Sequence, residues 1–314
     1  FVEHQIRLGD RLRFLAFTGA TQAHAARQAT SSNPARRRYV SAHRLLWNVH
    51  PDLALSLSEG ARYQADSPGP LYLSGILPYT LVERLAMQDE PSDSTENFLR
   101  NNILWSLDLM WRPRPGLMLY AELLADDIAT ETADMPTRGG FQIGGTFAPA
   151  WRGWDWTLGA EYTRVSNYTY SVYYQDLCRC DWEHQGRPLG YARGPDVEAL
   201  LLRCGAIATR RWSAAAWLRV VRKGAGEIGR PWTPGRAGCA STETPGCGDA
   251  PAWTLAEPVG RTAQIGLEAR YRAGSLTWFG VSVDHARSRR EGSAEGEPGE
   301  PALTRLRLLL SAGG

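Results

Sequence analysis

A strict alternation of apolar and polar residues between Asn101 and Phe147 constrains the fold more than any other feature of the sequence. Successive side chains of a β-strand point to opposite faces of a sheet, so a period of two sorts residues onto two faces. One set is apolar and carries no charge: Ile103, Trp105, Leu107, Leu109, Trp111, Leu117, Leu119, Leu123, Phe141, Ile143 and Phe147. The other set holds most of the polar groups, including Asp108 and Glu122. This stretch therefore predicts three strands with one apolar and one polar face.

The same alternation recurs along the whole chain and predicts about thirteen strands. They are expected at 3–9, 11–22, 36–48, 52–64, 100–112, 116–127, 139–148, 154–166, 196–209, 211–223, 261–272, 275–288 and 302–312. The clearest helical pattern, Tyr79 to Met87, lies inside a connection and does not interrupt this series. The sequence therefore indicates an all-β protein.

The connections between these strands alternate between short and long. The long ones are expected at 23–35, 65–99, 128–138, 167–195, 224–260 and 289–301. Short turns at one end and long loops at the other are typical of an up-and-down outer-membrane β-barrel. A charge facing lipid at the midplane costs about 2–4 kcal/mol, so the uncharged face is expected to meet lipid and the polar face a wet lumen. We therefore predict an antiparallel transmembrane barrel over residues 1–314, integral to the bacterial outer membrane and in contact with its lipid.

The composition agrees with a membrane barrel and argues against nucleic acid as a binding partner. The net charge is +2, and no basic cluster with interleaved aromatic residues is present, so nucleic acid is not an expected partner. No run approaches the ~18 apolar residues of a membrane-spanning helix, but strands of a barrel need only ~9–11 residues. Trp105, Trp111, Trp154, Trp212 and Tyr271 lie near predicted strand ends, where interfacial aromatic residues belong.

The predicted topology also indicates that the chain is incomplete at its N-terminus. The first strand ends at a short turn and so runs toward the periplasm, whereas a barrel chain enters from the periplasm. Phe1 is not an initiator residue and no signal peptide is present, so a longer precursor is expected. Bacterial single-chain barrels usually have an even strand number, and about thirteen visible strands require an odd number upstream.

Four of the five cysteines lie in two long polar connections, which favours loop disulfides in an oxidising compartment. Cys239 and Cys247 are close enough to close a small loop, and Cys178 and Cys180 can pair with each other or elsewhere. Their spacing does not match paired CxxC zinc knuckles, and no HExxH motif is present. No metal, cofactor or enzymatic activity is predicted.

Several short motifs, in this order and spacing, resemble the Wzi family of capsule-assembly outer-membrane proteins. They are His43-Arg44, Leu55–Glu59 (LSLSE), Leu119–Asp127 (LYAELLADD), Glu161–Thr163, Tyr168–Tyr170, His184, Pro188–Gly190 and Gly194–Asp196. The resemblance spans roughly residues 36 to 285 and does not include the family's N-terminal part. It implies a barrel of about eighteen strands, a lumen occluded by loops and a periplasmic helical plug, and lectin-like binding of surface polysaccharide.

Carboxylates on the predicted inner face are candidate ligand contacts. Glu122 and Asp126 share the inward side of one strand, and Asp127 lies just beyond them. Carboxylates accept hydrogen bonds from sugar hydroxyls, whereas a wall role would pair them with Arg100, Arg270 or Arg305. Glu59 joins this group only if a bulge at Ser58 to Gly60 shifts its strand's parity.

Two connections carry further candidates. The segment 182–196 is the predicted sugar platform, because aromatic faces stack on sugar rings and charged groups contact hydroxyls; its candidates are Trp182, His184, Arg187, Tyr191, Arg193 and Asp196. The connection 65–99 is too apolar to extend into water and is predicted to close the lumen as a lid, or else to form a protein contact surface.

Three functions remain open at this point. The chain is expected to bind or organise surface or capsular polysaccharide without catalysis. The alternatives are a porin or transporter for small solutes, and a structural subunit in contact with other envelope proteins.

Overall fold

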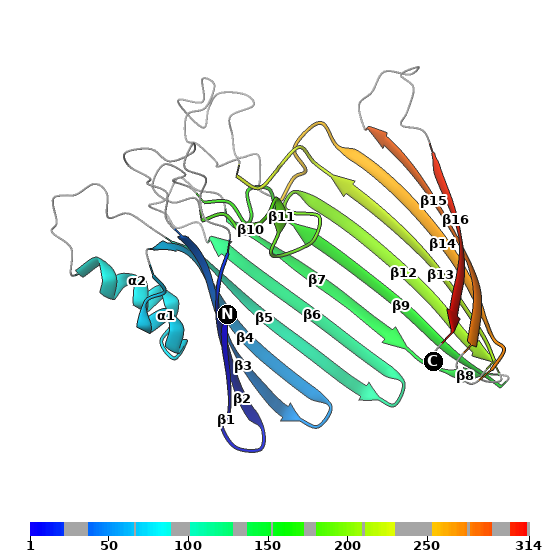
Figure 1. The fold of residues 1–314 in the computed structure, drawn as a ribbon, viewed down its shortest axis with the longest axis horizontal. Helices are drawn as coiled ribbons and strands as arrows, with labels where there is room; N and C mark the ends of the chain where they lie inside the picture. Colours follow the sequence, from blue (N-terminus) through cyan, green and yellow to red (C-terminus); the bar gives the residue numbers. More distant parts are fainter. Residues whose placement is uncertain are drawn as a thin grey trace.

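The alternating pattern produces a sheet in which strands adjacent in sequence are adjacent in space. The computed structural model describes residues 1–21, 37–65, 67–88, 101–127, 137–151, 153–172, 180–208, 211–229, 253–274, 277–290 and 302–312. The sheet has 14 strands, joined antiparallel, and the short β8 lies off the main path against β9. Figure 1 shows it as a curved wall with β1 at one edge and β16 at the other.

Apart from β1, which has six residues, the strands of the main path have 9 to 14 residues and are long enough to cross a bilayer when tilted. They are β1 (Val2–Arg7), β2 (Leu12–Ala20), β3 (Arg37–His50), β4 (Leu53–Ala65), β5 (Asn101–Arg114), β6 (Leu117–Asp127), β7 (Arg138–Phe147), β9 (Trp154–Val165), β12 (Val197–Ala208), β13 (Trp212–Lys223), β14 (Gly260–Arg272), β15 (Thr277–Arg290) and β16 (Leu303–Ala312). The two-residue β8 is Ala150–Trp151.

This path confirms the predicted order of strands and their antiparallel pairing within the described residues. Each predicted strand coincides with one element to within a few residues at either end. Among the described residues no pairing joins β1 to β16, so the sheet is open. A total of eighteen strands therefore stays a prediction.

Apolar side chains cover one face of the sheet, as the alternation predicts. Leu57, Leu107 and Leu123 lie opposite one another on β4, β5 and β6 and are each about half exposed. Near the short turns this face carries tryptophans; Trp47, Trp111, Trp151, Trp154 and Trp212 are all exposed. Such a band with an aromatic edge is typical of the lipid-facing side of a membrane barrel.

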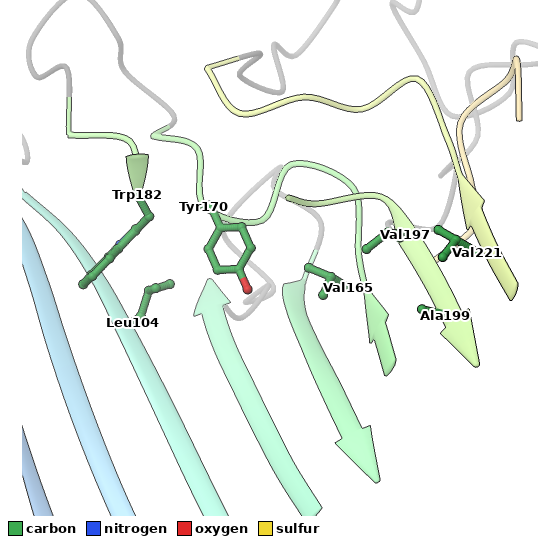
Figure 2. Close-up of a cluster of buried hydrophobic side chains, with 7 residues drawn as sticks. All are labelled: Leu104, Val165, Tyr170, Trp182, Val197, Ala199 and Val221. Atoms are coloured by element: carbon green, nitrogen blue, oxygen red, sulfur yellow. The ribbon is translucent and has the colours of Figure 1, made fainter. Parts of the chain in front are cut away.

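Residues 166–172 and 180–196, together called the covering segment, fold over the opposite, polar-parity face at the long-loop end. They include the hairpin of β10 (Glu183–His184) and β11 (Arg187–Pro188). Tyr170 and Trp182 of the covering segment pack with side chains of the sheet in a buried cluster, drawn in Figure 2, which also contains Leu104, Val165, Val197, Ala199 and Val221. The long connection after β9 therefore covers part of the inner face, the position that was expected for the connection 65–99.

Two helices, α1 (Pro70–Ser74) and α2 (Tyr79–Gln88), lie on the other side of the sheet. Tyr79 and Val82 pack with Tyr39, Ala61 and Tyr63, which belong to the apolar parity of β3 and β4. The prediction that 65–99 closes the lumen is wrong for the described part of this connection. Aromatic residues of this connection pack on the apolar face because the polar face offers fewer apolar side chains to contact.

Glycine at position 75 permits this close docking. Gly75 ends α1 in a left-handed conformation with φ of 59°, and a Cβ there would lie 2.6 Å from the Cβ of Ala16 on β2. A side chain would thus be strained and would also push the helix off the sheet.

Candidate functional site

A row of polar side chains crosses the inner face from β4 to β9. The register places Ser56 opposite Asp108, Asp108 opposite Glu122, Glu122 opposite Gln142, and Gln142 opposite Thr163. Residues directly opposite in antiparallel strands have Cβ atoms about 4.5–5.5 Å apart. The alternation of the sequence and the register of the sheet together therefore build a continuous polar row.

The side chains at the β4–β5 end of this row have hydrogen-bond or ion-pair partners, whereas those in the middle of the row do not. Arg44 donates to Ser56 Oγ at 2.6 Å and lies 3.4 Å from Asp108 Oδ2, which also accepts a hydrogen bond from Ser56. Within the described residues, the side chains of Glu122 and Gln142 have no hydrogen-bond or ion-pair partner. The predicted partner Arg270 pairs with Glu268 instead, and Arg100 lies outside the described residues. Glu122 and Gln142 thus keep their hydrogen-bonding capacity for water or a ligand.

A cavity of about 390 Å³ lies between this row and the covering segment. Its polar and aromatic lining includes Glu122, Gln142, Thr163, Tyr170, Trp182 and Tyr191. The sheet supplies hydrogen-bonding groups on one side, and the covering segment supplies aromatic rings on the other. This arrangement can hold a ligand that is both flat and rich in hydroxyls.

A second hollow of about 460 Å³ adjoins the first and shares Thr163, Tyr191 and Ala192 with it. Glu161, Arg193 and Arg219 add charge to its lining. Glu161 accepts a hydrogen bond of 2.6 Å from the hydroxyl of Tyr120. The two hollows together form a polar surface along the inner wall.

Buried carboxylates fix the backbone of the covering segment. Asp126 Oδ2 accepts a hydrogen bond of 2.7 Å from Tyr170 N, and Asp181 Oδ1 accepts one from Val172 N. The fully buried Asp196 accepts from the amides of Gly226 and Ala256, which draws two further loops toward β12. These carboxylates therefore hold loops in place.

Tyr170 is held over the cavity by this network. Its hydroxyl accepts a hydrogen bond of 3.0 Å from Tyr191 N. Burial raises the pKa of Tyr170 to about 12, so its hydroxyl keeps its proton at physiological pH.

The structure separates the predicted site residues, and only some of them line the cavities. Glu122, Trp182 and Tyr191 line the first cavity, and Arg193 lines the second. Asp126 and Asp196 are buried in loop contacts. Asp127 ends β6, and its side chain lies outside the described part of the chain.

His184 and Arg187 pair across the β10–β11 hairpin and do not line either cavity. Trp182 is 7% exposed, so it is a packed side chain with one edge at the cavity and not an open platform. Its ring contacts Gly60, where a Cβ would lie 2.7 Å from Trp182 Cη2.

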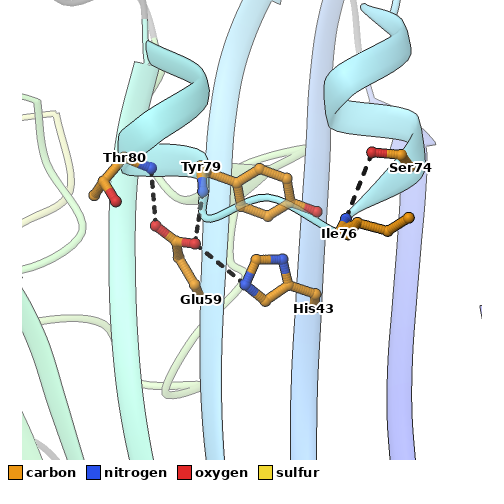
Figure 3. Close-up of polar contacts among 6 residues, drawn as sticks. All are labelled: His43, Glu59, Ser74, Ile76, Tyr79 and Thr80. Atoms are coloured by element: carbon orange, nitrogen blue, oxygen red, sulfur yellow. Dashed lines mark hydrogen bonds and ion pairs between the residues drawn. The ribbon is translucent and has the colours of Figure 1, made fainter. Parts of the chain in front are cut away.

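Glu59 lies on the opposite face of the sheet from this cavity. The register runs without a shift from Leu53 to Tyr63, so the bulge that Glu59 needed to point inward does not form, and its place among the inner-face ligand candidates is wrong. Glu59 keeps the outward parity and accepts hydrogen bonds from the first amides of α2 (Figure 3). The Glu59 carboxylate, which was expected to contact a ligand in the lumen, is therefore bonded to backbone amides of α2 instead.

Gln142, Thr163, Glu161 and Arg219 line the cavities but are absent from the sequence-based candidates. Their signal was present in the alternation, because all four fall on the polar parity of their strands. Finding them required the tertiary structure: the register places Gln142 beside Glu122, and Tyr191 lines the same two cavities from the segment above.

The cysteines are only partly described. Cys180 is buried and disulfide-bonded, and Cys204 is free. Cys178, Cys239 and Cys247 lie outside the described residues, so their pairing stays a prediction. Among the residues that the structure describes, no group of three or more His, Cys, Asp or Glu side chains could hold a metal ion.

No family model and no curated protein matches the sequence. Among solved structures, Wzi of Escherichia coli, an outer-membrane protein involved in group 1 capsule assembly and a carbohydrate-binding β-barrel, matches with a TM-score of 0.52 and 14% identity over 89% of this chain and 53% of its own. The fold is an antiparallel up-and-down sheet like the wall of an outer-membrane β-barrel, and it is open within the described residues. This chain spans about half the length of Wzi.

Two other outer-membrane proteins are less similar. OccD3 (OpdP) of Pseudomonas aeruginosa matches with a TM-score of 0.44 and 10% identity over 99% of this chain and 66% of its own. BamA of Haemophilus ducreyi matches with a TM-score of 0.37 and 10% identity over 98% and 61%. Across the described residues, neither helix has the length and apolarity needed to cross a membrane.

Proposed function

We propose that this chain is an integral outer-membrane barrel protein that binds surface polysaccharide at the inner wall beneath residues 180–196, without catalysis. The observation that carries the proposal is the cavity in which unpaired Glu122 and Gln142 face the rings of Tyr170 and Tyr191. Sugars offer hydroxyls to carboxylates and amides, and an apolar ring face to aromatic side chains. The similarity in fold to a carbohydrate-binding barrel adds support.

Direct binding to immobilised polysaccharides tests the proposal. The purified full chain, folded in detergent, is applied to a panel of bacterial capsular polysaccharides and lipopolysaccharide O-chains. Tyr191→Ala and the pair Glu122→Gln with Gln142→Ala are expected to weaken retention about tenfold each, equivalent to about 1.4 kcal/mol. Asp284→Asn, on the same inner face but outside both cavities, is the matched control and leaves retention unchanged.

A porin or transporter for small solutes is the second candidate. The observation that favours it is the charged inner wall outside the cavities, which includes Arg44 with Asp108 and Arg307 with Asp284. Charged lumen walls tune ion selectivity in barrels. Ion conduction in planar bilayers together with no retention on any polysaccharide would favour this candidate and exclude the first.

The structural-subunit alternative makes a different prediction. A subunit of an envelope assembly would co-purify with fixed partner proteins in native membranes, and the cavity variants above would leave that association intact.

A further inference from the structure

The helix pair α1–α2 leaves large apolar side chains uncovered on its outer surface. Ile76, between the helices, is 69% exposed, and Leu71, Leu81 and Leu85 are 43%, 42% and 39% exposed. Leu81 and Leu85 are four residues apart on α2, so they share one side of that helix. Exposed apolar groups gathered in one place mark a surface that contacts something other than water.

The position of the helices on the sheet indicates which kind of surface these apolar side chains contact. Glu59, which holds the start of α2, follows Leu57 by two residues on β4, and Trp105 opposite it precedes Leu107 by two. Two residues of a strand span about 7 Å. The helices therefore lie directly beside the band of Leu57, Leu107 and Leu123, on the same face and toward the long loops.

The attachment of α2 is specific. Glu59 Oε2 accepts a hydrogen bond of 2.7 Å from Tyr79 N, and Oε1 accepts one of 3.0 Å from Thr80 N. His43 Nε2 lies 3.2 Å from the same carboxylate, and its ring stacks on Tyr79 with 4.7 Å between centroids (Figure 3). A carboxylate at a helix N-terminus is stabilised by the helix dipole.

The fixed side of the helices faces the sheet, and the uncovered side faces away from it. Tyr79 and Val82 are buried against the sheet, whereas Thr80, Leu81, Arg84 and Leu85 are exposed. An apolar side that also carries a cation suits the boundary between acyl chains and anionic headgroups.

We propose that α1 and α2 form a lipid-contacting ledge, in which Leu71, Ile76, Leu81 and Leu85 extend the lipid-facing band of the barrel to headgroup level. This inference rests on the membrane location in the proposed function. Continuity with the band of Leu57 and Leu107 selects a lipid surface over a protein partner or a second copy of the chain.

Photo-crosslinking in native outer membranes tests the ledge. Benzoylphenylalanine is introduced singly at Leu81 or Ile76 of the full chain, and adducts are identified by mass spectrometry. Leu107 in the band is the positive control. Leu189 is the matched negative control, because it is 41% exposed, close to the 42% of Leu81, but lies in the segment over the inner face.

Lipid adducts at Leu81 and Ile76, at least about fivefold above Leu189, are expected if both residues lie in the interface. Adducts with another protein or with a second copy would overturn the ledge, as would no lipid adduct at Leu81 while Leu107 gives one. Absence of lipid adducts at Leu107 as well would overturn the membrane barrel itself, so the two failures are distinguishable.

Discussion

Glu59 Oε2 accepts a hydrogen bond of 2.7 Å from Tyr79 N, which joins the middle of β4 to the first turn of α2. The carboxylate is 1% exposed, so its charge is offset by the amides of Tyr79 and Thr80 and by His43 instead of by water. A buried carboxylate on the apolar face of a barrel wall requires such partners.

Removing the Glu59 carboxylate is therefore expected to release the helices. Glu59→Ala leaves two amides without acceptors, at a cost of about 1–3 kcal/mol each. Hydrogen exchange at Tyr79 and Thr80 should accelerate, while exchange in β5 and β6 should not. Glu122→Gln, on the opposite face, is the control. Equal protection of Tyr79 in Glu59→Ala and in the wild type would contradict the docking role.

Gly60 is expected to tolerate no side chain, because Trp182 occupies the space of its Cβ. Gly60→Ala should displace the indole at a cost of about 1–3 kcal/mol. The amides of Trp182 and Leu189, which bond to Tyr170 O and Trp182 O, should then exchange faster. Gly159→Ala is the matched control, since the nearest atom to its Cβ is 3.7 Å away. A stable Gly60→Ala protein with unchanged protection would refute the contact.

Asp196 is expected to affect loop order rather than ligand contact. Asp196→Ala removes the acceptor for Gly226 N and Ala256 N and should expose residues 224–229 and 253–259 to proteolysis. Asp196→Asn keeps one oxygen and should show an intermediate effect. Asp284→Ala, at a half-buried position on the inner wall, should leave cleavage of these loops unchanged. Identical cleavage patterns for Asp196→Ala and the wild type would rule out the anchoring role.

Docking of α2 is expected to weaken as the pH rises. Burial raises the pKa of Glu83 from 4.5 to about 7, an effect that the neighbouring Arg84 partly opposes. The docked helix thus binds the Glu83 proton more tightly than the free helix does. The resulting stability is fully present below about pH 4.5 and is lost as the pH rises through about 7. Hydrogen exchange at Val82 should therefore accelerate between pH 5 and 8 after correction for the intrinsic rate, but not in Glu83→Gln.

Much of the wall could be predicted because its signal is local. The period of two in segments such as Leu117 to Asp127 follows from the geometry of a single strand. It predicted the strands, their order and the apolar face, including Leu107 and Leu123. The helix from Tyr79 was also predicted, since its pattern lies within one short segment.

The candidate site was only partly predictable. Glu122 was identified by its parity, but Gln142 and Thr163 became site residues only through the register that places them beside it. Asp126 and Asp196 have residue types suited to ligands, yet both are occupied by loop amides. The identity of a residue does not reveal which backbone groups will reach it.

By itself, the sequence determined the strands, their two faces and the alternation of short turns with long loops, because each is a property of neighbouring residues. The tertiary structure decided where the long connections lie. Glu59 and Gly60 are adjacent on β4, but Glu59 receives α2 on the apolar face and Gly60 receives Trp182 on the polar face. These contacts join residues about 20 and about 120 positions apart, and such long-range contacts depend on packing that no local pattern encodes.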